Sequence, residues 1–529
     1  MTPLLRALAA AAAGAALLSA ACGQPVVTAP VPEVDPARIQ AHLEKYAQAE
    51  AAGMDPGGRG EQLAVAYARS VFTEMGIAVQ TPAVPLTKIR TKRASVTLTG
   101  AAARSLAEHD EVVAWSRRHE EVTTADGDLV FVGYGISAPR QGWDDYKNVD
   151  VRGKVLLMLI GDPMVGQRHL LGSVGGDLFG RSRYKFDEAE RRGAVGVLLV
   201  HLEGRADASW DQIEEAQAEI LDPGSPGQFT SHLSLEGWIH ADATRQIFTS
   251  AGLDFDEALS KAQENNFAPT SLPIHVTAHV ESEISPVTSA NVVATIPPAG
   301  SKAQYVLFST QWNTLPAGHA NGRDLTDADP KDQSPPGASV VLELARALSR
   351  AGKPHGGFVF LLVTAEPQGL IGLDSYLDNP AAAASSTRAA IHVVGFDEHV
   401  NDKSVDIVGM GYEGLKGLVR SEATDQFRVV ESDMEPERLH FFREGRVAYT
   451  LKQIPSIFVS SGTTVDRDAA AAAPRDMSAA VLDVRLLYHV GLRVSRNDNW
   501  PPWNPSNSLL EYVPKKPEAE GRSRLRGAR

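Results

Sequence analysis

Two segments near the beginning of the chain carry apolar residues at helical spacing. The spacing predicts helices over residues 37–52 and 61–75, which end at Gly53 and Gly76. A strand-like run, residues 94–98, follows the second helix. The apolar positions are Ile39, Leu43, Tyr46 and Ala49 in the first segment, and Leu63, Tyr67, Val71 and Met75 in the second. The folded part of the chain therefore opens with two amphipathic helices and a strand.

Strands and helices alternate from residue 128 onwards. Apolar runs predict strands over residues 129–135, 154–160 and 195–200, and helical spacing predicts a helix over residues 185–192 before the third strand. This order indicates a small α/β or β-rich module that ends near Ser282.

A second alternating run begins at Asn291. Strands are predicted over residues 291–296, 305–309 and 358–364, and a helix over residues 339–350. The last strand is continuously apolar, as are the central strands of a doubly wound sheet, which are buried on both faces. The pattern therefore predicts the α/β fold class.

Composition narrows the possible functions. A chain of 529 residues is long enough for two or three domains, or for one large domain with an insert. Its 43% hydrophobic and 22% charged residues are typical of globular proteins. The formal charge of -14 argues against a general nucleic-acid-binding protein, because phosphate contacts need a basic surface.

The first 22 residues have the order of a secretory signal. Arg6 is the positive side chain, an alanine- and leucine-rich stretch follows to Leu18, and small residues precede Cys22. A cysteine in this position resembles a lipobox, in which the cysteine is acylated and becomes the mature N-terminus. An ordinary cleaved signal with a chance cysteine is the alternative. Residues 23–35 contain three prolines and no helical pattern, and they are predicted to be a tether.

The single cysteine has two consequences. Because Cys22 is the only cysteine, a disulfide within the chain is impossible. An acylated Cys22 would attach an exported protein to a membrane of the cell envelope. Since no aspartate follows Cys22 directly, the usual sorting rule predicts the outer membrane, on its periplasmic side, if the host has two membranes.

Several phrases carry a resemblance to a known family. The first alternating run contains "LVFVGYGISAPRQGWDDY" and "YKFDEAERRGAVGVLLVH", and the second contains "SANVVATIPP", "YVLFSTQWN" and "FVFLLVTAEPQGLIGLDSYL". On these phrases the chain resembles the bacterial zinc aminopeptidases of the leucyl-aminopeptidase and glutamate-carboxypeptidase type, with an inserted protease-associated domain. The resemblance implies an eight-stranded, doubly wound mixed β-sheet flanked by helices, with the insert leaning over the catalytic cleft.

The resemblance also implies a division into six parts. They are a lipoprotein signal peptide (residues 1–22), the tether (23–35), the N-terminal part of the peptidase-like domain (36–127), the protease-associated domain (128–282), the peptidase-like domain proper (283–500) and a C-terminal tail (501–529).

Such enzymes hold two zinc ions about 3.5–4 Å apart, with imidazole and carboxylate ligands around an activated water. The family's five ligand positions are occupied here by Gln311, Gln333, Pro367, Val394 and Thr464. Amides are weak neutral ligands, and proline and valine have no side-chain donor. Asp332 is a weak candidate, one residue from the bridging position. We therefore predict no bound cofactor.

Glu366 matches the glutamate that acts as general base in the family. Without a metal-bound water it has no acidified proton to accept, so we predict that it is vestigial.

Other polar groups have alternative interpretations. Asp397, Glu398 and His399, with His392 nearby, could form a relocated metal site or a polar loop. Four aspartates could bind calcium or form a solvated loop; they are Asp324, Asp327, Asp329 and Asp332. Trp143–Tyr146 is expected to pack the insert rather than touch a ligand, and Trp500–Trp503 to pack on the body rather than bind a partner.

Three functions remain possible at this point. The first is a pseudoenzyme of the envelope whose cleft binds a peptide or a protein partner. The second is an active zinc-dependent exopeptidase with displaced ligands. The third is a structural envelope lipoprotein whose cleft binds nothing. Retained zinc and turnover would favour the active exopeptidase. Saturable peptide binding without turnover would favour the pseudoenzyme.

Overall fold

The computed structural model describes most of the chain in segments. The described residues are 33–147, 149–165, 168–171, 179–203, 209–216, 219–226, 233–299, 303–312, 336–352, 354–366, 369–396, 404–409, 413–432, 448–449, 452–461 and 476–496. None of the helices in these segments is long and apolar enough to cross a membrane.

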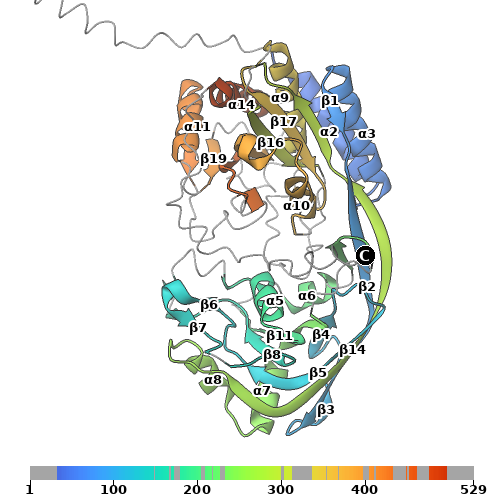
Figure 1. Ribbon diagram of the computed structural model, residues 1–529, viewed down its shortest axis with the longest axis vertical. Coiled ribbons are helices and arrows are strands. Elements are labelled where there is room, and N and C mark those ends of the chain that lie inside the picture. Colours follow the sequence, from blue (N-terminus) through green and yellow to red (C-terminus); the bar gives the residue numbers. More distant parts are fainter. Residues whose placement is uncertain are drawn as a thin grey trace, which may run out of the picture.

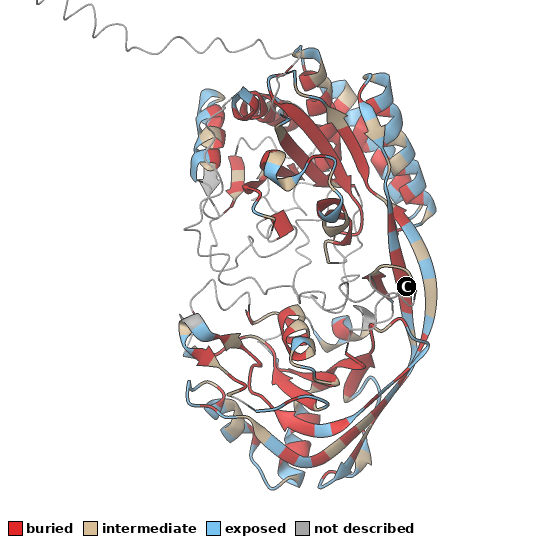
Figure 2. Cartoon of the chain, viewed as in Figure 1, coloured by how far each residue is buried: buried red, intermediate tan, exposed pale blue. Residues whose placement is uncertain are grey.

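The described residues form two lobes, one above the other in Figure 1. The eight-stranded lobe comprises the described residues of 33–80 and 291–496 and is built on a mixed sheet of eight strands. The insert lobe comprises the described residues of 83–290 and is built on a sheet of nine strands. Each sheet has its own hydrophobic core, and Figure 2 shows buried residues concentrated in the strands of both.

The sheet of the eight-stranded lobe has its parallel strands in the centre. Strands β17, β16, β18 and β21 run parallel to one another, and β15 and β19 flank them in antiparallel pairings. In spatial order the strands are β1 (Ala78–Gln80), β15 (Val292–Ile296), β17 (Gly357–Val363), β16 (Tyr305–Gln311), β18 (Thr387–Phe396), β21 (Ser456–Ser461), β19 (Ser404–Val408) and β20 (Val429–Ser432). The predicted eight-stranded mixed sheet is confirmed.

Helices cover both faces of this sheet, which makes it doubly wound. Five helices share the larger core on one face: α2 (Pro36–Glu50), α3 (Arg59–Glu74), α9 (Pro336–Arg350), α11 (Glu413–Asp425) and α14 (Ser478–Arg496). On the other face α10 (Ile371–Asp378) packs in a smaller core, and η5 (Ala384–Ser386) precedes β18. The faces follow the strand alternation, since Val306 and Phe308 of β16 face the larger core and Leu307 the smaller one.

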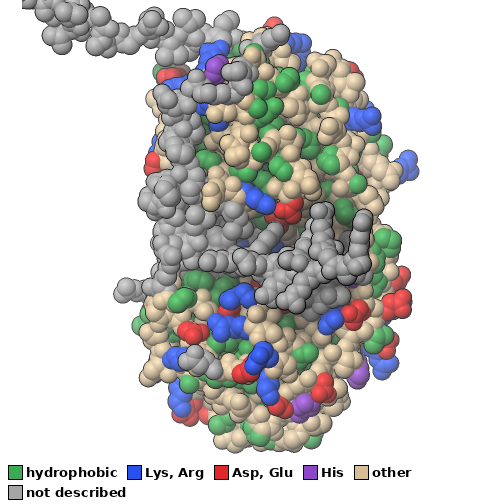
Figure 3. All heavy atoms as spheres, in the orientation of Figure 1, with side chains coloured by type: hydrophobic (Ala, Val, Ile, Leu, Met, Phe, Trp, Pro, Cys, Tyr) green, Lys and Arg blue, Asp and Glu red, His purple; other side chains and the backbone are tan. Residues whose placement is uncertain are grey.

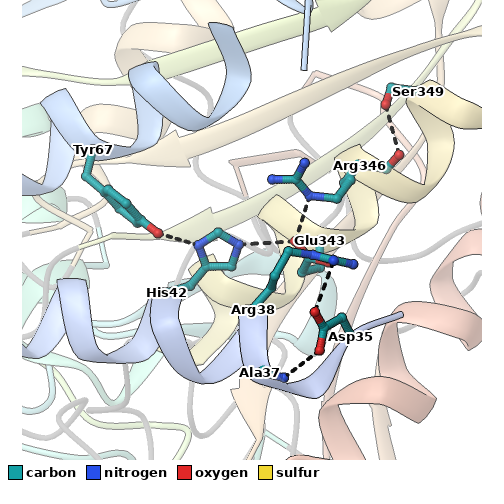
Figure 4. A network of polar contacts seen from close by, with 8 residues as sticks. All are labelled: Asp35, Ala37, Arg38, His42, Tyr67, Glu343, Arg346 and Ser349. Atoms are coloured by element: carbon teal, nitrogen blue, oxygen red, sulfur yellow. Dashed lines mark hydrogen bonds and ion pairs between the residues drawn. The ribbon is translucent and has the colours of Figure 1, made fainter. Parts of the chain in front are cut away.

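A buried carboxylate ties α2 to α9 (Figure 4). Glu343 of α9 accepts hydrogen bonds from Arg38 Nε of α2 at 3.1 Å and from Arg346 Nε at 2.9 Å. His42 Nε2 lies 3.3 Å from the same carboxylate, and its Nδ1 lies 2.6 Å from the Tyr67 hydroxyl of α3. The first two helices are thus anchored to the central part of the lobe by charge as well as by apolar contact.

The insert lobe combines a long twisted sheet with short helices. Its strands are, in spatial order, β12 (Ile220–Pro223), β2 (Ala83–Gly100), β14 (Thr270–Ala290), β5 (Val122–Phe131), β8 (Val155–Leu159), β11 (Gly196–His201), β13 (Leu235–His240) and β4 (Val112–Trp115), with β3 (Arg104–Ser105) beside β2. The helices are α5 (Ser182–Arg191), α6 (Trp210–Ala216), α7 (Ala241–Ser250) and α8 (Phe255–Lys261). Two short ladders and η2 (Pro139–Gln141) complete it; the ladders pair β6 (Ser137–Ala138) with β7 (Trp143–Asp144) and β9 (Met164–Val165) with β10 (Arg168–His169).

Strands β2 and β14 connect the two lobes as a ribbon. They pair antiparallel from Gly100 opposite Ile274 to Ala83 opposite Ala290, with a register shift between Glu281 and Ser282. Beyond Ala83 and Ala290, the chain continues into β1 and β15, which pair with each other in the eight-stranded lobe.

The predicted domain boundaries differ from this arrangement. The expected division after residue 127 falls inside β5, and the one after residue 282 falls inside β14. The insert lobe also includes β2, whose 18 residues the sequence analysis had placed with the first domain. The reason is that β2 alternates between buried and exposed positions and pairs with β14 along its whole length, whereas only its short apolar centre resembles a strand in the local sequence.

Candidate functional site

The candidate site lies where three parallel strands of the eight-stranded lobe end. Strands β16, β17 and β18 are neighbours, and their carboxyl ends meet at one edge of the sheet. Ligand sites of open α/β sheets are usually found at this edge. Gln311 is the last residue of β16, Glu366 follows β17, and Val394 lies near the end of β18.

The loop after β17 holds Glu366 in an uncommon backbone conformation. Ala365 has φ of 49° and Leu370 has φ of 66°, although neither is a glycine, and Gly369 has φ of 102°. Such left-handed residues are costly unless the surroundings fix them, and they often occur at functional sites. The amides of Gly369 and Leu370 donate to the Glu366 carbonyl at 3.1 and 2.9 Å, which closes the loop on itself.

Asn291 fixes both ends of this loop. Its side-chain Oδ1 accepts a hydrogen bond from the Thr364 amide at 3.0 Å, and its Nδ2 donates to the Gly372 carbonyl at 2.7 Å. A Cβ at Gly372 would lie 2.2 Å from the Thr364 carbonyl oxygen, so only glycine fits there. Asn291 and the residues on either side of Glu366 therefore hold it at a defined place.

A second buried acid supports the loop from the side of α3. Glu61 accepts hydrogen bonds from the Ser289 hydroxyl at 2.7 Å and the Ala290 amide at 2.8 Å. The Ser289 hydroxyl lies 2.5 Å from that of Thr364. Burial raises the pKa of Glu61 despite these hydrogen bonds.

Glu366 is the last member of a row of buried polar side chains, which we call the polar chain: Tyr449, Ser309, His392 and Glu366. The Tyr449 hydroxyl donates to Ser309 Oγ at 2.7 Å, and Ser309 Oγ lies 3.1 Å from His392 Nδ1. His392 Nε2 lies 3.6 Å from Glu366 Oε1. Ser309 and His392 are register partners on the adjacent parallel strands β16 and β18, which places their side chains on one face of the sheet.

The polar chain is enclosed. The His392 ring stacks on Phe458 of β21 with centroids 4.6 Å apart and planes at 25°, and Glu366 is 4% exposed. Burial, and then the charge of Glu366, raise the pKa of the Tyr449 hydroxyl far above its usual range. Ser309 is fully buried and accepts a hydrogen bond from the Tyr449 hydroxyl, so its own hydroxyl is not placed to attack a substrate.

Only two of the five residues at the family's zinc-ligand positions lie in the described residues. Gln311 and Val394 are partly buried at the ends of their strands, and Glu366 lies beside His392. The other residues singled out in the sequence lie outside the described residues: Asp332, Gln333, Pro367, Thr464, Cys22, Asp324, Asp327, Asp329, Asp397, Glu398, His399 and residues 500–503.

The described side chains do not fit a two-zinc centre. Gln311 offers a neutral amide and Val394 no donor at all, whereas zinc takes imidazole and carboxylate ligands. Within the described segments, no three histidine, cysteine or acidic side chains are grouped so that they could hold a metal ion. No step of chemistry can therefore be derived through a metal from these residues.

Sequence reasoning missed most of the polar chain. It considered His392 only as part of a relocated metal site and did not single out Ser309 or Tyr449. The signal available for Ser309 was its place two residues before Gln311 in a strand, which puts both side chains on one face. Tyr449 had no such signal.

The insert lobe contacts the Glu366 loop. Arg183 of α5, on the side of the insert lobe nearest the other lobe in Figure 1, donates from Nη1 to the Gly369 carbonyl at 3.5 Å. Three ribbon residues, Val84, Leu86 and Val287, pack against Ala365 and Ile371. The loop is thus in contact with both α5 and the ribbon.

Trp143–Tyr146 packs the insert lobe, as expected. The Trp143 indole donates to Asp145 at 2.8 Å, and the Asp145 carboxylate also accepts from the Ile136 amide at 2.9 Å. Both aromatic side chains of the segment are buried in the core of the insert lobe.

Comparisons with known proteins agree with this architecture. Residues 291–489 match the model of peptidase family M28. An aminopeptidase from Aneurinibacillus sp. strain AM-1 superposes with a TM-score of 0.50 and 17% identity, over 89% of this chain and 96% of that one. This likeness shows a common fold. No curated protein sequence is significantly similar to the chain.

Two further solved structures align over a similar length. The zinc aminopeptidase BSAP from Bacillus subtilis is 15% identical, over 88% of this chain and 95% of that one, with a TM-score of 0.42. A peptidase M28 precursor from Shewanella amazonensis SB2B is 12% identical, over 89% and 97%, with a TM-score of 0.42.

Proposed function

We propose, from the match of residues 291–489 to peptidase family M28 and from the aminopeptidase fold, that this protein is a peptidase-like pseudoenzyme that binds a peptide or protein without hydrolysing it. Aminopeptidases of this family usually use zinc. The chain keeps their fold and the position of their general base, while the ligand positions carry other residues.

One observation carries the proposal. Glu366, at the position of the base, is buried beside His392, and the two ligand positions that lie in the described residues carry Gln311 and Val394. A base that is to deprotonate a metal-bound water must have that water within hydrogen-bond reach. Among the described residues, the group beside this carboxylate is the His392 imidazole of the polar chain.

The insert lobe is proposed to be a protease-associated domain that helps to enclose the binding site. The contact of Arg183 with Gly369 and the packing of the ribbon on Ala365 support this role, because they connect the insert lobe to the loop that carries Glu366.

The proposed partners are a peptide or protein ligand and, through the lipid on Cys22, a membrane of the cell envelope. The signal-like first 22 residues support export and lipid attachment. Nucleic acid is not a proposed partner. On the described part of the face seen in Figure 3, lysines and arginines are interspersed with acidic residues, and the formal charge is -14.

The test is a zinc and turnover measurement on protein that begins near Asp35. After incubation with zinc and dialysis, we expect less than about 0.1 zinc per chain and no hydrolysis of aminoacyl or dipeptide substrates. Saturable binding of short peptides to the same sample would support the pseudoenzyme. Its absence would leave a structural envelope lipoprotein.

An active zinc exopeptidase is the second candidate, favoured by the fixed conformation of the Glu366 loop. About two zinc ions per chain with chelator-sensitive turnover would establish it and overturn the pseudoenzyme. The matched control is Glu366→Gln, which removes the general base. This variant should abolish hydrolysis by the protein itself and leave the activity of a contaminating peptidase unchanged.

A further inference from the structure

The hydrogen bonds of the polar chain have a direction. The Tyr449 phenol donates to Ser309 Oγ, and the described partner for the single Ser309 hydroxyl proton is then His392 Nδ1. An imidazole that accepts at Nδ1 carries its proton on Nε2. That atom is the one that faces Glu366, 3.6 Å away.

We propose that Tyr449 and Ser309 are positioning residues that hold His392 with its Nε2–H directed at Glu366. The His392 imidazole then faces the Glu366 carboxylate. In a zinc aminopeptidase, the corresponding carboxylate would face a metal-bound water. This inference rests on the proposed function, because it concerns the same site, and it gives the buried Glu366 carboxylate a neighbouring N–H group of the protein itself.

The described surroundings of His392 favour this orientation. Phe458, its register partner on β21, stacks on the ring face, while Ser309, its register partner on β16, contacts Nδ1. Turning the ring over would place carbon atoms against Ser309 and lose the hydrogen bond. The side chain is 3% exposed, so water cannot replace that bond without opening the core.

The polar chain also brings together elements that are distant in the sequence. Ser309 and His392 lie on neighbouring strands, Glu366 follows β17, and Tyr449 precedes β21. Removing the Tyr449 hydroxyl therefore tests an effect on His392 that passes through Ser309, since Tyr449 makes its described hydrogen bond to Ser309.

The experiment is nitrogen-15 NMR of protein labelled in histidine. The His392 signal is identified by its loss in His392→Gln. We expect a neutral imidazole protonated at Nε2 in the wild type, and in Ser309→Ala and Tyr449→Phe a mixture of tautomers at His392. A wild-type signal protonated at Nδ1, or one that neither variant changes, would overturn the proposal.

Two matched controls separate positioning from packing. Tyr376→Phe removes a buried phenol from the same small core, and Ser456→Ala removes a buried hydroxyl for which the described residues supply no hydrogen-bond partner. Neither residue belongs to the polar chain, so both variants should keep the wild-type tautomer of His392.

A chemical rescue gives a second readout in case the signals overlap. We expect His392→Ala to lower the Tm by roughly 5–10 °C and added imidazole to restore at least half of the loss. Toluene has a similar size but no hydrogen-bonding atom and should restore little. Equal rescue by both compounds would mean that His392 acts only as packing, which would overturn the proposal.

The outcomes distinguish this inference from the proposed function. Two bound zinc ions with turnover would refute the pseudoenzyme even if His392 is protonated at Nε2. A metal-free, inactive protein in which His392 is protonated at Nδ1 would keep the pseudoenzyme and refute the role of Tyr449 and Ser309.

Discussion

Glu343 remains ionised although its side chain is almost wholly buried. Burial alone would raise its pKa, but hydrogen bonds from His42 and Arg346 and the nearby charge of Arg38 lower it to about 2. A buried carboxylate with several donors is stabilising only while it keeps its charge. Because the folded-state pKa lies below the usual 4.5, the stabilisation is fully present above pH 4.5 and is lost as the pH falls towards 2.

Glu343→Gln should therefore lower the free energy of unfolding at pH 7 by about 2–3 kcal/mol, because Arg38 and Arg346 lose their counter-charge. Urea unfolding at several pH values measures this difference, which should shrink between pH 4.5 and 2. The exposed Glu44→Gln on α2 is the control and should change the stability by less than about 0.5 kcal/mol. A difference that stays constant with pH would mean that charge is not the cause.

At the scale of elements, the periodic patterns predicted most of the architecture. The expected helix over 37–52 is α2 (Pro36–Glu50), and the one over 339–350 is α9 (Pro336–Arg350). A helix with one apolar stripe or a strand that is continuously apolar is recognisable from local sequence alone. The long strand β2 was recognised only at its centre, since its polar exposed positions resemble a loop unless β14 is known to lie beside it.

The polar chain could not be predicted for a related reason. More than fifty residues separate each of Ser309, Glu366, His392 and Tyr449 from at least two of the others. Their meeting depends on strand order, which the resemblance gave, and on side-chain direction, which it did not. That Gln311 and Val394 stand where the family has zinc ligands could be predicted from the sequence, because this prediction needs only the identity of a residue at an aligned position.

The connection between β17 and α10 depends on a glycine that no other residue can replace. A Cβ at Gly372 would lie 2.2 Å from the Thr364 carbonyl oxygen and 2.7 Å from Asn291 Oδ1. Gly372→Ala should lower the free energy of unfolding by about 2–4 kcal/mol, as measured with urea. Gly414→Ala in α11 meets no atom within 4 Å and should stabilise by up to about 1 kcal/mol. If both variants changed the free energy of unfolding equally, the close approach of Thr364 to Gly372 would not be the cause of the effect.

At the scale of the whole molecule, the insert lobe leaves and rejoins the eight-stranded lobe at one place. Ala83 lies opposite Ala290, and just beyond them β1 pairs with β15. Replacing residues 83–290 by an Asn-Gly turn would therefore join β1 and β15 as a β-hairpin. The two lobes also have separate hydrophobic cores.

We expect the protein without residues 83–290 to keep a cooperative thermal transition and its helical circular dichroism. Its stability should be lower by about 2–5 kcal/mol, because Val84, Leu86 and Val287 no longer cover Ala365 and Ile371. A non-cooperative transition would show instead that the eight-stranded lobe requires the insert lobe to fold.

The paired strands of the ribbon also determine how the lobes can move. Two lobes that are joined by one pair of strands can rotate about that pair, but the pair keeps them from separating. The register shift between Glu281 and Ser282 interrupts the ladder, and such a bulge bends and twists a strand pair locally. Any swing that carries α5 away from the eight-stranded lobe must first break the contact of Arg183 with Gly369. A rotation of the lobes about the ribbon would therefore act directly on the loop that carries Glu366.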